Sequence, residues 1–319
     1  MTLLPRLSRS QWRASRREMN DKTEMSKMKD RIIPPIPTPF VDEEFSPEKL
    51  KFNLEKMNST QVGGFLVLGS NGEAVFLSDE DKFMIIETSR EFTPPDWFLV
   101  VGAGHESTKG TIQFTRRAAE LGADYALIGN PHYYKSAMTS ETLYDHYKAI
   151  AEASPIPIIP YNSPGFTGIN MGPQLIGKLA KHPNVLGVKD GTGNVAQLSE
   201  FKRLGGPEFL IFTGNAPTFL AALFVGISGG MMPIANIYPD LWVQMLRLYR
   251  KGDLEEARRL DSILMPMTTV IMKYGTGGIK AAMDIQGFYG GPPLRPLNPP
   301  SSHGLEEIRM ALKKVEEAL

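Results

Sequence analysis

The chain has no cysteine. This absence excludes disulfide bonds, thiolate nucleophiles, and zinc ribbons or iron–sulfur clusters built on cysteine ligands. Its histidines show no metal-ligand spacing, and no paired acids converge with them: His105, His132, His146, His182 and His303. A metal-dependent enzyme is therefore disfavoured, and we expect no metal site.

An excess of charge of either sign is also missing, because Lys+Arg and Asp+Glu both total 35. Proteins that bind nucleic acids or membrane surfaces need a basic excess, so neither partner is expected. No apolar stretch approaches the roughly 20 residues that span a bilayer. The 319 residues can instead bury a large core without covalent cross-links.

The N-terminal segment is rich in arginine and serine and has no acid in its first seventeen residues. Such a composition is typical of a mitochondrial transit peptide. The alternative is a disordered basic extension of a cytoplasmic protein that starts internally, at Met19, Met25 or Met28. Residues 1–30 are therefore set apart from the fold as a targeting or disordered extension.

From residue 31 onward, short apolar runs alternate with segments of helical period. Eight runs are predicted as strands: Ile33–Pro37, Gly64–Gly69, Trp97–Gly102, Asp124–Gly129, Ile156–Tyr161, Val185–Lys189, Phe209–Thr213 and Ile227–Met232. They are nearly continuous hydrophobic runs, as a parallel sheet covered on both faces requires.

The alternation permits either a closed barrel or an open doubly wound sheet. The nearest approach to a dinucleotide-binding fingerprint, Gly102–Ser107, lacks its third glycine, which favours the barrel. We therefore predict an α/β fold, a (β/α)₈ TIM barrel over residues 31–237. A C-terminal helical extension of the same domain is expected over 238–319.

Enzymes with this fold place their active site where the strands end. Lys189 closes one predicted strand, and burial there would lower its pKa and leave a neutral amine able to attack a ketone. The alternative is a lysine that reaches solvent or pairs with Asp190. Tyr161 closes the preceding strand and could shuttle protons for that amine, although many such tyrosines are only half-buried core residues.

The segment Gly69–Glu73 joins a strand to a helix. Its backbone amides, with the side chains of Ser70 and Asn71, could hold a carboxylate. The alternative is an ordinary Asn-Gly turn. Glu73 is interpreted as structural.

Taken together, the ordered motifs of this chain resemble the dihydrodipicolinate synthase / N-acetylneuraminate lyase family, which comprises class I pyruvate-dependent aldolases. The resemblance covers the chain from about Ile32 to the C-terminal helices. It rests on Gly69-Ser-Asn-Gly-Glu73, Tyr133-Tyr134, Tyr161-Asn-Ser-Pro164 with Thr167-Gly168, and Gly187-Val-Lys-Asp-Gly-Thr-Gly193.

The resemblance implies a role for each matching position. Lys189 corresponds to the Schiff-base lysine, Tyr161 to the proton-relay tyrosine and Tyr134 to a second relay tyrosine, with Tyr133 as the alternative. Ser70 and Asn71 stand where the synthases bind the keto-acid carboxylate, and Ser70 would also pass protons. Backbone contacts to the substrate are implied at Gly214 and Met231.

The chain departs from the synthases at two places. Phe166 stands where the synthases carry an arginine that grips a second carboxylate, and Ser70-Asn71 replaces a Thr-Thr pair. Both changes, with other matching segments, resemble the branch of mitochondrial 4-hydroxy-2-oxoglutarate aldolases. Those segments are Glu106-Ser-Thr108, Ser154-Pro-Ile-Pro157 and Gly287-Phe-Tyr-Gly-Gly291-Pro-Pro-Leu.

The expected activity is therefore cleavage of a 4-hydroxy-2-oxo acid to pyruvate and an aldehyde such as glyoxylate. Two alternatives within the family are a 2-keto-3-deoxy sugar-acid aldolase or dehydratase, and a synthase that condenses pyruvate with an aldehyde. A different class would be a catalytically silent barrel that serves as a binding protein. The resemblance further implies no cofactor beyond the imine on Lys189, and a homotetramer built as a dimer of dimers.

Overall fold

The computed structural model describes residues 28–319. Residues 1–27 of the predicted targeting segment, with the possible internal starts Met19 and Met25, lie outside this range. Eight parallel strands form a single sheet in the order β1-β10-β9-β8-β7-β6-β5-β4. Their bounds are β1 Arg31–Ile32, β4 Gly64–Val67, β5 Phe98–Gly102, β6 Tyr125–Gly129, β7 Ile158–Asn162, β8 Gly187–Asp190, β9 Leu210–Thr213 and β10 Gly229–Gly230.

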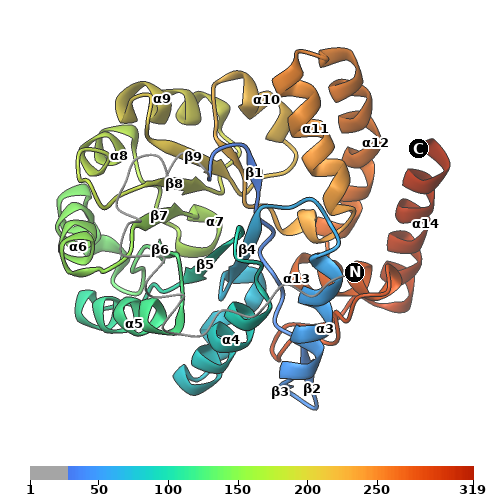
Figure 1. Cartoon of the computed structure of the whole chain (residues 1–319), viewed down its shortest axis with the longest axis horizontal. Coiled ribbons are helices and arrows are strands. Elements are labelled where there is room, and N and C mark those ends of the chain that lie inside the picture. The colour runs from blue at the N-terminus through green and yellow to red at the C-terminus, as the bar shows by residue number, and fades with distance from the viewer. Residues whose placement is uncertain (1–27) are drawn as a thin grey trace.

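The sheet closes on itself between its first and last strands. A parallel bridge joins Pro35 to Leu66, and the Leu66 N–H donates to Pro34 O at 3.1 Å. The predicted (β/α)₈ barrel is thereby confirmed, and Figure 1 shows the ring of helices around it. The first strand precedes the predicted run Ile33–Pro37, of which only Pro35 forms a bridge, because prolines at 34, 35 and 37 have no N–H to donate to the ladder.

Helices alternate with the strands and cover the outside of the barrel (Figure 1). Most of them begin at a residue whose side chain caps the helix, such as Ser78, which forms the capping box that starts α4. Their bounds are α3 Pro47–Met57, α4 Asp79–Phe92, α5 Thr108–Leu121, α6 Ser140–Ala153, α8 Pro173–Leu179, α9 Val195–Gly205 and α10 Phe219–Phe224.

The helix α11, Pro239–Lys251, follows β10 and contacts both α10 and β1, so it completes the ring. Three further helices pack outside it: α12 Leu254–Met272, α13 Gly275–Ile285 and α14 Ser302–Ala318. The segment predicted as an appendage thus shares its first helix with the barrel, and the boundary after residue 237 stays a prediction. Within residues 28–319, no helix combines the length and apolar composition that a membrane span needs.

Several short elements were not predicted and lie in the loops that follow strands. They are the hairpin of β2 Phe40–Val41 with β3 Glu44–Phe45, the short helix α7 Pro164–Thr167, and the 3₁₀ turns η1 Ser70–Gly72, η2 Ala74–Phe76, η3 Lys135–Ala137 and η4 Pro233–Asn236. Inside the barrel, a buried apolar cluster includes Leu66, Val100, Ile159, Phe212 and Met231, and Tyr161 packs on it.

Candidate active site

Lys189 and Tyr161 lie side by side on neighbouring strands. They are register partners of β8 and β7, and the Lys189 Nζ lies 4.3 Å from the centroid of the Tyr161 ring. The Lys189 side chain is only 4% exposed. The two residues that the sequence singled out for amine chemistry therefore share one dry position in the barrel mouth.

Burial determines the acidity of both groups. It lowers the pKa of Lys189 from 10.5 to about 7, because the ammonium form loses its hydration. A large fraction of this amine is then neutral near pH 7. Burial also raises the pKa of Tyr161, while hydrogen bonds with Ser70 and Ser163 lower it in part. The phenol therefore stays protonated at neutral pH.

Asp190 does not pair with Lys189, although it is the next residue. Successive side chains of a strand point to opposite faces, so Asp190 faces away from the barrel interior. Its carboxylate accepts hydrogen bonds from the side-chain amides of Asn162 at 2.7 Å and Gln197 at 3.0 Å. It also accepts one from the hydroxyl of Thr192 at 2.5 Å. Within residues 28–319, no carboxylate forms an ion pair with Lys189, which removes the alternative of a Lys189–Asp190 pair.

Gly214, one of the predicted backbone contacts, closes one side of the lysine stem. A Cβ added at Gly214 would lie 3.2 Å from Lys189 Cε, so glycine leaves room for the side chain and for an adduct on it. Met231 is fully buried in the apolar cluster inside the barrel, and its N–H donates to Thr213 O at 2.9 Å. Met231 thus forms part of the floor below the polar groups.

The predicted carboxylate cradle follows β4. Ser70 and Asn71 lie in η1, both partly buried, and the Ser70 side chain is close enough to Tyr161 to lower the pKa of its phenol. Ser163 was not singled out as a site residue, yet from the start of α7 it lies close enough to Tyr161 to lower the pKa of its phenol. The only signal for Ser163 in the sequence is its place two residues after Tyr161.

Tyr134 is not brought to the amine in this chain. Its side chain is 72% exposed and packs edge-on against Tyr133, with ring centroids 5.1 Å apart. Phe166 on α7 is 70% exposed. A second relay role for Tyr134 stays a prediction, because it depends on what covers this loop.

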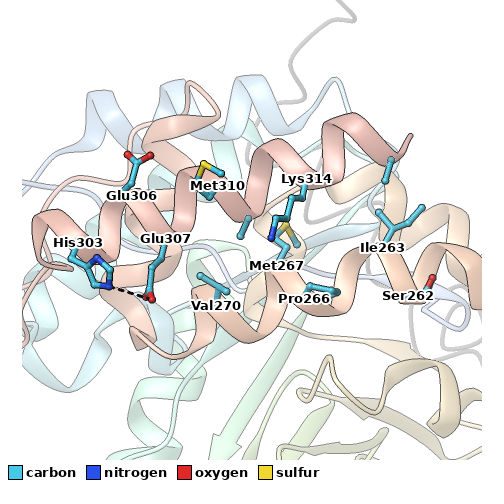
Figure 2. Close-up of a pocket in the computed structure, with 12 residues that line it drawn as sticks. Ser262, Ile263, Pro266, Met267, Val270, His303, Glu306, Glu307, Met310 and Lys314 are labelled. Carbon is cyan, nitrogen blue, oxygen red and sulfur yellow. Dashed lines mark ion pairs between the residues drawn. The ribbon is translucent and has the colours of Figure 1, made fainter.

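A groove of about 580 Å³ lies on the outer surface, between α12 and α14 (Figure 2). Its lining is mostly apolar, and the polar side chains in it include those of His303, Glu307 and Lys314. No residue of the predicted site contributes to this groove, so its size says nothing about the chemistry in the barrel. Across residues 28–319, no cluster of three or more His, Asp or Glu side chains could hold a metal ion.

Comparison with known proteins agrees with this architecture. The model of the dihydrodipicolinate synthetase family matches residues 28–315. A probable mitochondrial 4-hydroxy-2-oxoglutarate aldolase of Emericella nidulans is 36% identical over 258 residues, 79% of this chain and 84% of that protein. A 4-hydroxy-tetrahydrodipicolinate synthase of Thermodesulfovibrio yellowstonii is 35% identical, over 74% of this chain and 79% of that protein.

Solved structures give the same result. The dihydrodipicolinate synthase of Acinetobacter baumannii, solved in complex with pyruvate, superimposes with a TM-score of 0.86 at 28% identity. The match covers 91% of this chain and 99% of that one. The family predicted from the ordered motifs is confirmed: the chain belongs to the dihydrodipicolinate synthetase family of aldolases and synthases.

Proposed function

We propose that this protein is a class I lyase that cleaves a 4-hydroxy-2-oxo acid of the 4-hydroxy-2-oxoglutarate type to pyruvate and an aldehyde, glyoxylate in that case. The observation that carries the proposal is the buried Lys189 amine, 4.3 Å from the Tyr161 ring. A dry amine with a pKa of about 7 is the nucleophile that a ketone substrate needs.

The reaction would proceed through a covalent imine. The neutral Lys189 amine attacks C2 of the substrate, and loss of water from the carbinolamine gives the protonated imine. Tyr161 donates its phenolic proton to the carbinolamine hydroxyl that leaves as this water. The resulting phenolate, relayed through Ser70, takes the proton of the C4 hydroxyl, and the electron pair of the broken C3–C4 bond moves into the enamine. The aldehyde leaves, C3 is reprotonated, and water hydrolyses the imine to release pyruvate and the free amine.

A substrate with a second carboxylate needs a cation where Phe166 offers none. Lys135 of η3 supplies a candidate, because its ammonium lies against Gly168 at the end of α7, two residues beyond Phe166. Gly168 has a left-handed backbone, with φ 68°, which favours glycine, and the absence of a Cβ leaves space for this ammonium. An ammonium beside α7 would attract a distal carboxylate as a point charge.

The similarity to the Emericella nidulans aldolase favours this substrate among those of the family. The second candidate is condensation of pyruvate with an aldehyde, as in a synthase. It is favoured by the larger number of similar proteins that are named synthases, such as that of Thermodesulfovibrio yellowstonii. Cleavage of 2-keto-3-deoxy sugar acids is the third. A silent barrel would have no need for a buried amine beside a phenol.

A panel of 2-oxo acids tests the proposal. Purified protein would receive 4-hydroxy-2-oxoglutarate, 2-keto-3-deoxygluconate, or pyruvate with aspartate semialdehyde, and pyruvate release or consumption would be measured. We expect the highest kcat/KM with 4-hydroxy-2-oxoglutarate. A higher kcat/KM with either of the other two would reject 4-hydroxy-2-oxoglutarate as the substrate but would still agree with imine chemistry on Lys189.

Lys135→Met tests the distal carboxylate. We expect a KM for 4-hydroxy-2-oxoglutarate about tenfold higher, and an unchanged KM for a 4-hydroxy-2-oxo acid without that carboxylate. Lys148→Met, which removes another exposed lysine on α6, is the control and should change neither. An equal rise with both substrates would remove Lys135 from substrate selection.

We further propose a mitochondrial location, with a cytoplasmic one as the alternative, and a homotetramer. The name of the Emericella nidulans protein supports the first, together with the arginine-rich segment before residue 28. Exposed aromatic side chains on the loops of the barrel mouth, Tyr133, Tyr134 and Phe166, support association between subunits. Fractionation of cells and the molar mass in solution would test these proposals.

A further inference from the structure

A buried ion pair lies directly behind the carboxylate cradle. Lys280 of α13 approaches Glu73 with its Nζ 2.6 Å from Oε1, and both side chains are completely buried. Glu73 follows η1, the turn that carries Ser70 and Asn71. The sequence indicated a structural role for Glu73 but offered no partner for it, because Lys280 lies in the C-terminal helices.

Glu73 fixes the end of the cradle turn through its backbone and its side chain. Its backbone is left-handed, with φ 55°, and its N–H donates to Ser70 O at 3.2 Å. The second carboxylate oxygen accepts the Leu294 N–H at 2.7 Å. The Thr38 hydroxyl donates a hydrogen bond to the carbonyl of Gly72, the residue before Glu73, at 2.7 Å.

Lys280 connects the same turn to two further segments. Its ammonium donates to Pro292 O at 3.0 Å and lies 4.3 Å from the centre of the Phe40 ring in β2. The pair therefore joins the cradle, the loop after β1, α13 and the chain around residues 292–294 into one rigid unit.

Stability gives no good reason for such a pair. Removing two charges from water costs about as much free energy as their attraction gains. A protein with a well-packed apolar pair of the same volume is often equally stable. A left-handed backbone at a residue other than glycine adds strain. A short, directional contact between charges fixes the geometry of the turn, which an apolar contact does not do.

We propose that Glu73 and Lys280 are positioning residues that set the orientation of Ser70 and Asn71 toward the substrate's carboxylate. Through them, the C-terminal helix α13 contributes to the affinity of a site in which it places no residue. This inference rests on the proposed function, since it assumes that the cradle binds the carboxylate of a 2-oxo acid.

The test is the double variant Glu73→Gln/Lys280→Met, which removes both charges and keeps the volumes. Trapping with borohydride over a range of pyruvate concentrations gives the half-saturating pyruvate and the limiting rate of adduct formation. We expect the half-saturating concentration to rise about tenfold, and the limiting rate, which reports the Lys189 amine, to stay within about threefold of the parent.

A matched control is the largely buried pair of Arg90 with Asp124 at the opposite end of the barrel, 3.1 Å apart. Asp124 also accepts a backbone N–H, that of Leu99, at 2.7 Å. The variant Arg90→Met/Asp124→Asn should change the urea midpoint of unfolding but leave the half-saturating pyruvate unchanged. An equal effect of both double variants on pyruvate would mean that loss of a buried pair acts through general loosening, and would overturn the proposal.

Glu73→Gln provides a second variant, because its amide oxygen can still accept the Leu294 N–H. We expect a rise in half-saturating pyruvate of about threefold or more, and a folded double variant or Glu73→Gln protein with the parent's value would overturn the positioning role. Failure of the parent to form any pyruvate adduct would instead overturn the proposed function. The two failures are therefore distinguishable.

Discussion

At the scale of single residues, Lys189 has the environment that imine chemistry requires. Reduction by borohydride in the presence of pyruvate should leave a covalent adduct on Lys189, found by peptide mapping. Because burial lowers its pKa to about 7, the reactive neutral amine forms as pH rises through that value. The trapping rate should therefore fall about tenfold per pH unit below 7 and level off above it. A midpoint near 10, or label on another lysine, would rule out this role.

The role that we propose for Tyr161 is that of a proton relay rather than the nucleophile. Tyr161→Phe keeps the ring against Lys189 and removes the hydroxyl, whose pKa Ser70 and Ser163 lower. We expect turnover to fall by roughly 10²–10⁴-fold, with the unfolding midpoint nearly unchanged. Tyr147→Phe is the matched control, since its buried hydroxyl bonds Asn130 away from the amine. Turnover of Tyr161→Phe within tenfold of the parent would exclude Tyr161 from the relay.

At the scale of elements, the end of β8 is held to β7 and α9 by Asp190. Its carboxylate accepts hydrogen bonds from Asn162 on β7, Gln197 on α9 and both the N–H and hydroxyl of Thr192. Asp190→Ala would leave these buried donors unpaired, at a cost of about 3–5 kcal/mol in the free energy of unfolding.

Denaturant unfolding would measure this loss. We expect kcat to fall as well, since the register of Tyr161 opposite Lys189 depends on the same strand ends. Asp190→Asn, which retains an acceptor, should lose less of both. If the free energy of unfolding of Asp190→Ala equalled that of the parent, water would have replaced the carboxylate as the hydrogen-bond acceptor.

At the scale of the whole molecule, the barrel brings together residues that are far apart in sequence. Ser70, Tyr161, Lys189 and Gly214 come from four different strand ends, and closure of the sheet places them in one mouth. Of the three outer helices, α13 adds Lys280, which pairs with Glu73 behind that mouth. Metal independence stays a prediction, and retention of full activity after dialysis against a chelator would test it.

The sequence by itself determined the fold class, the eight strands and the amine–phenol pair. Continuous apolar runs specify buried parallel strands, and a parallel barrel must present the ends of those strands at one face. Local pattern also placed Ser70 and Asn71 in a turn after a strand.

Only the tertiary structure decided what surrounds these groups. The dryness of the Lys189 amine, the pairing of Asp190 with amides rather than with that amine, and the contact of Lys135 with Gly168 all depend on distant segments packing together. The same holds for Lys280 and Glu73, which no spacing in the chain connects. Hydration and pairing of a charge depend on its neighbours in space, whereas periodicity reports only neighbours along the chain.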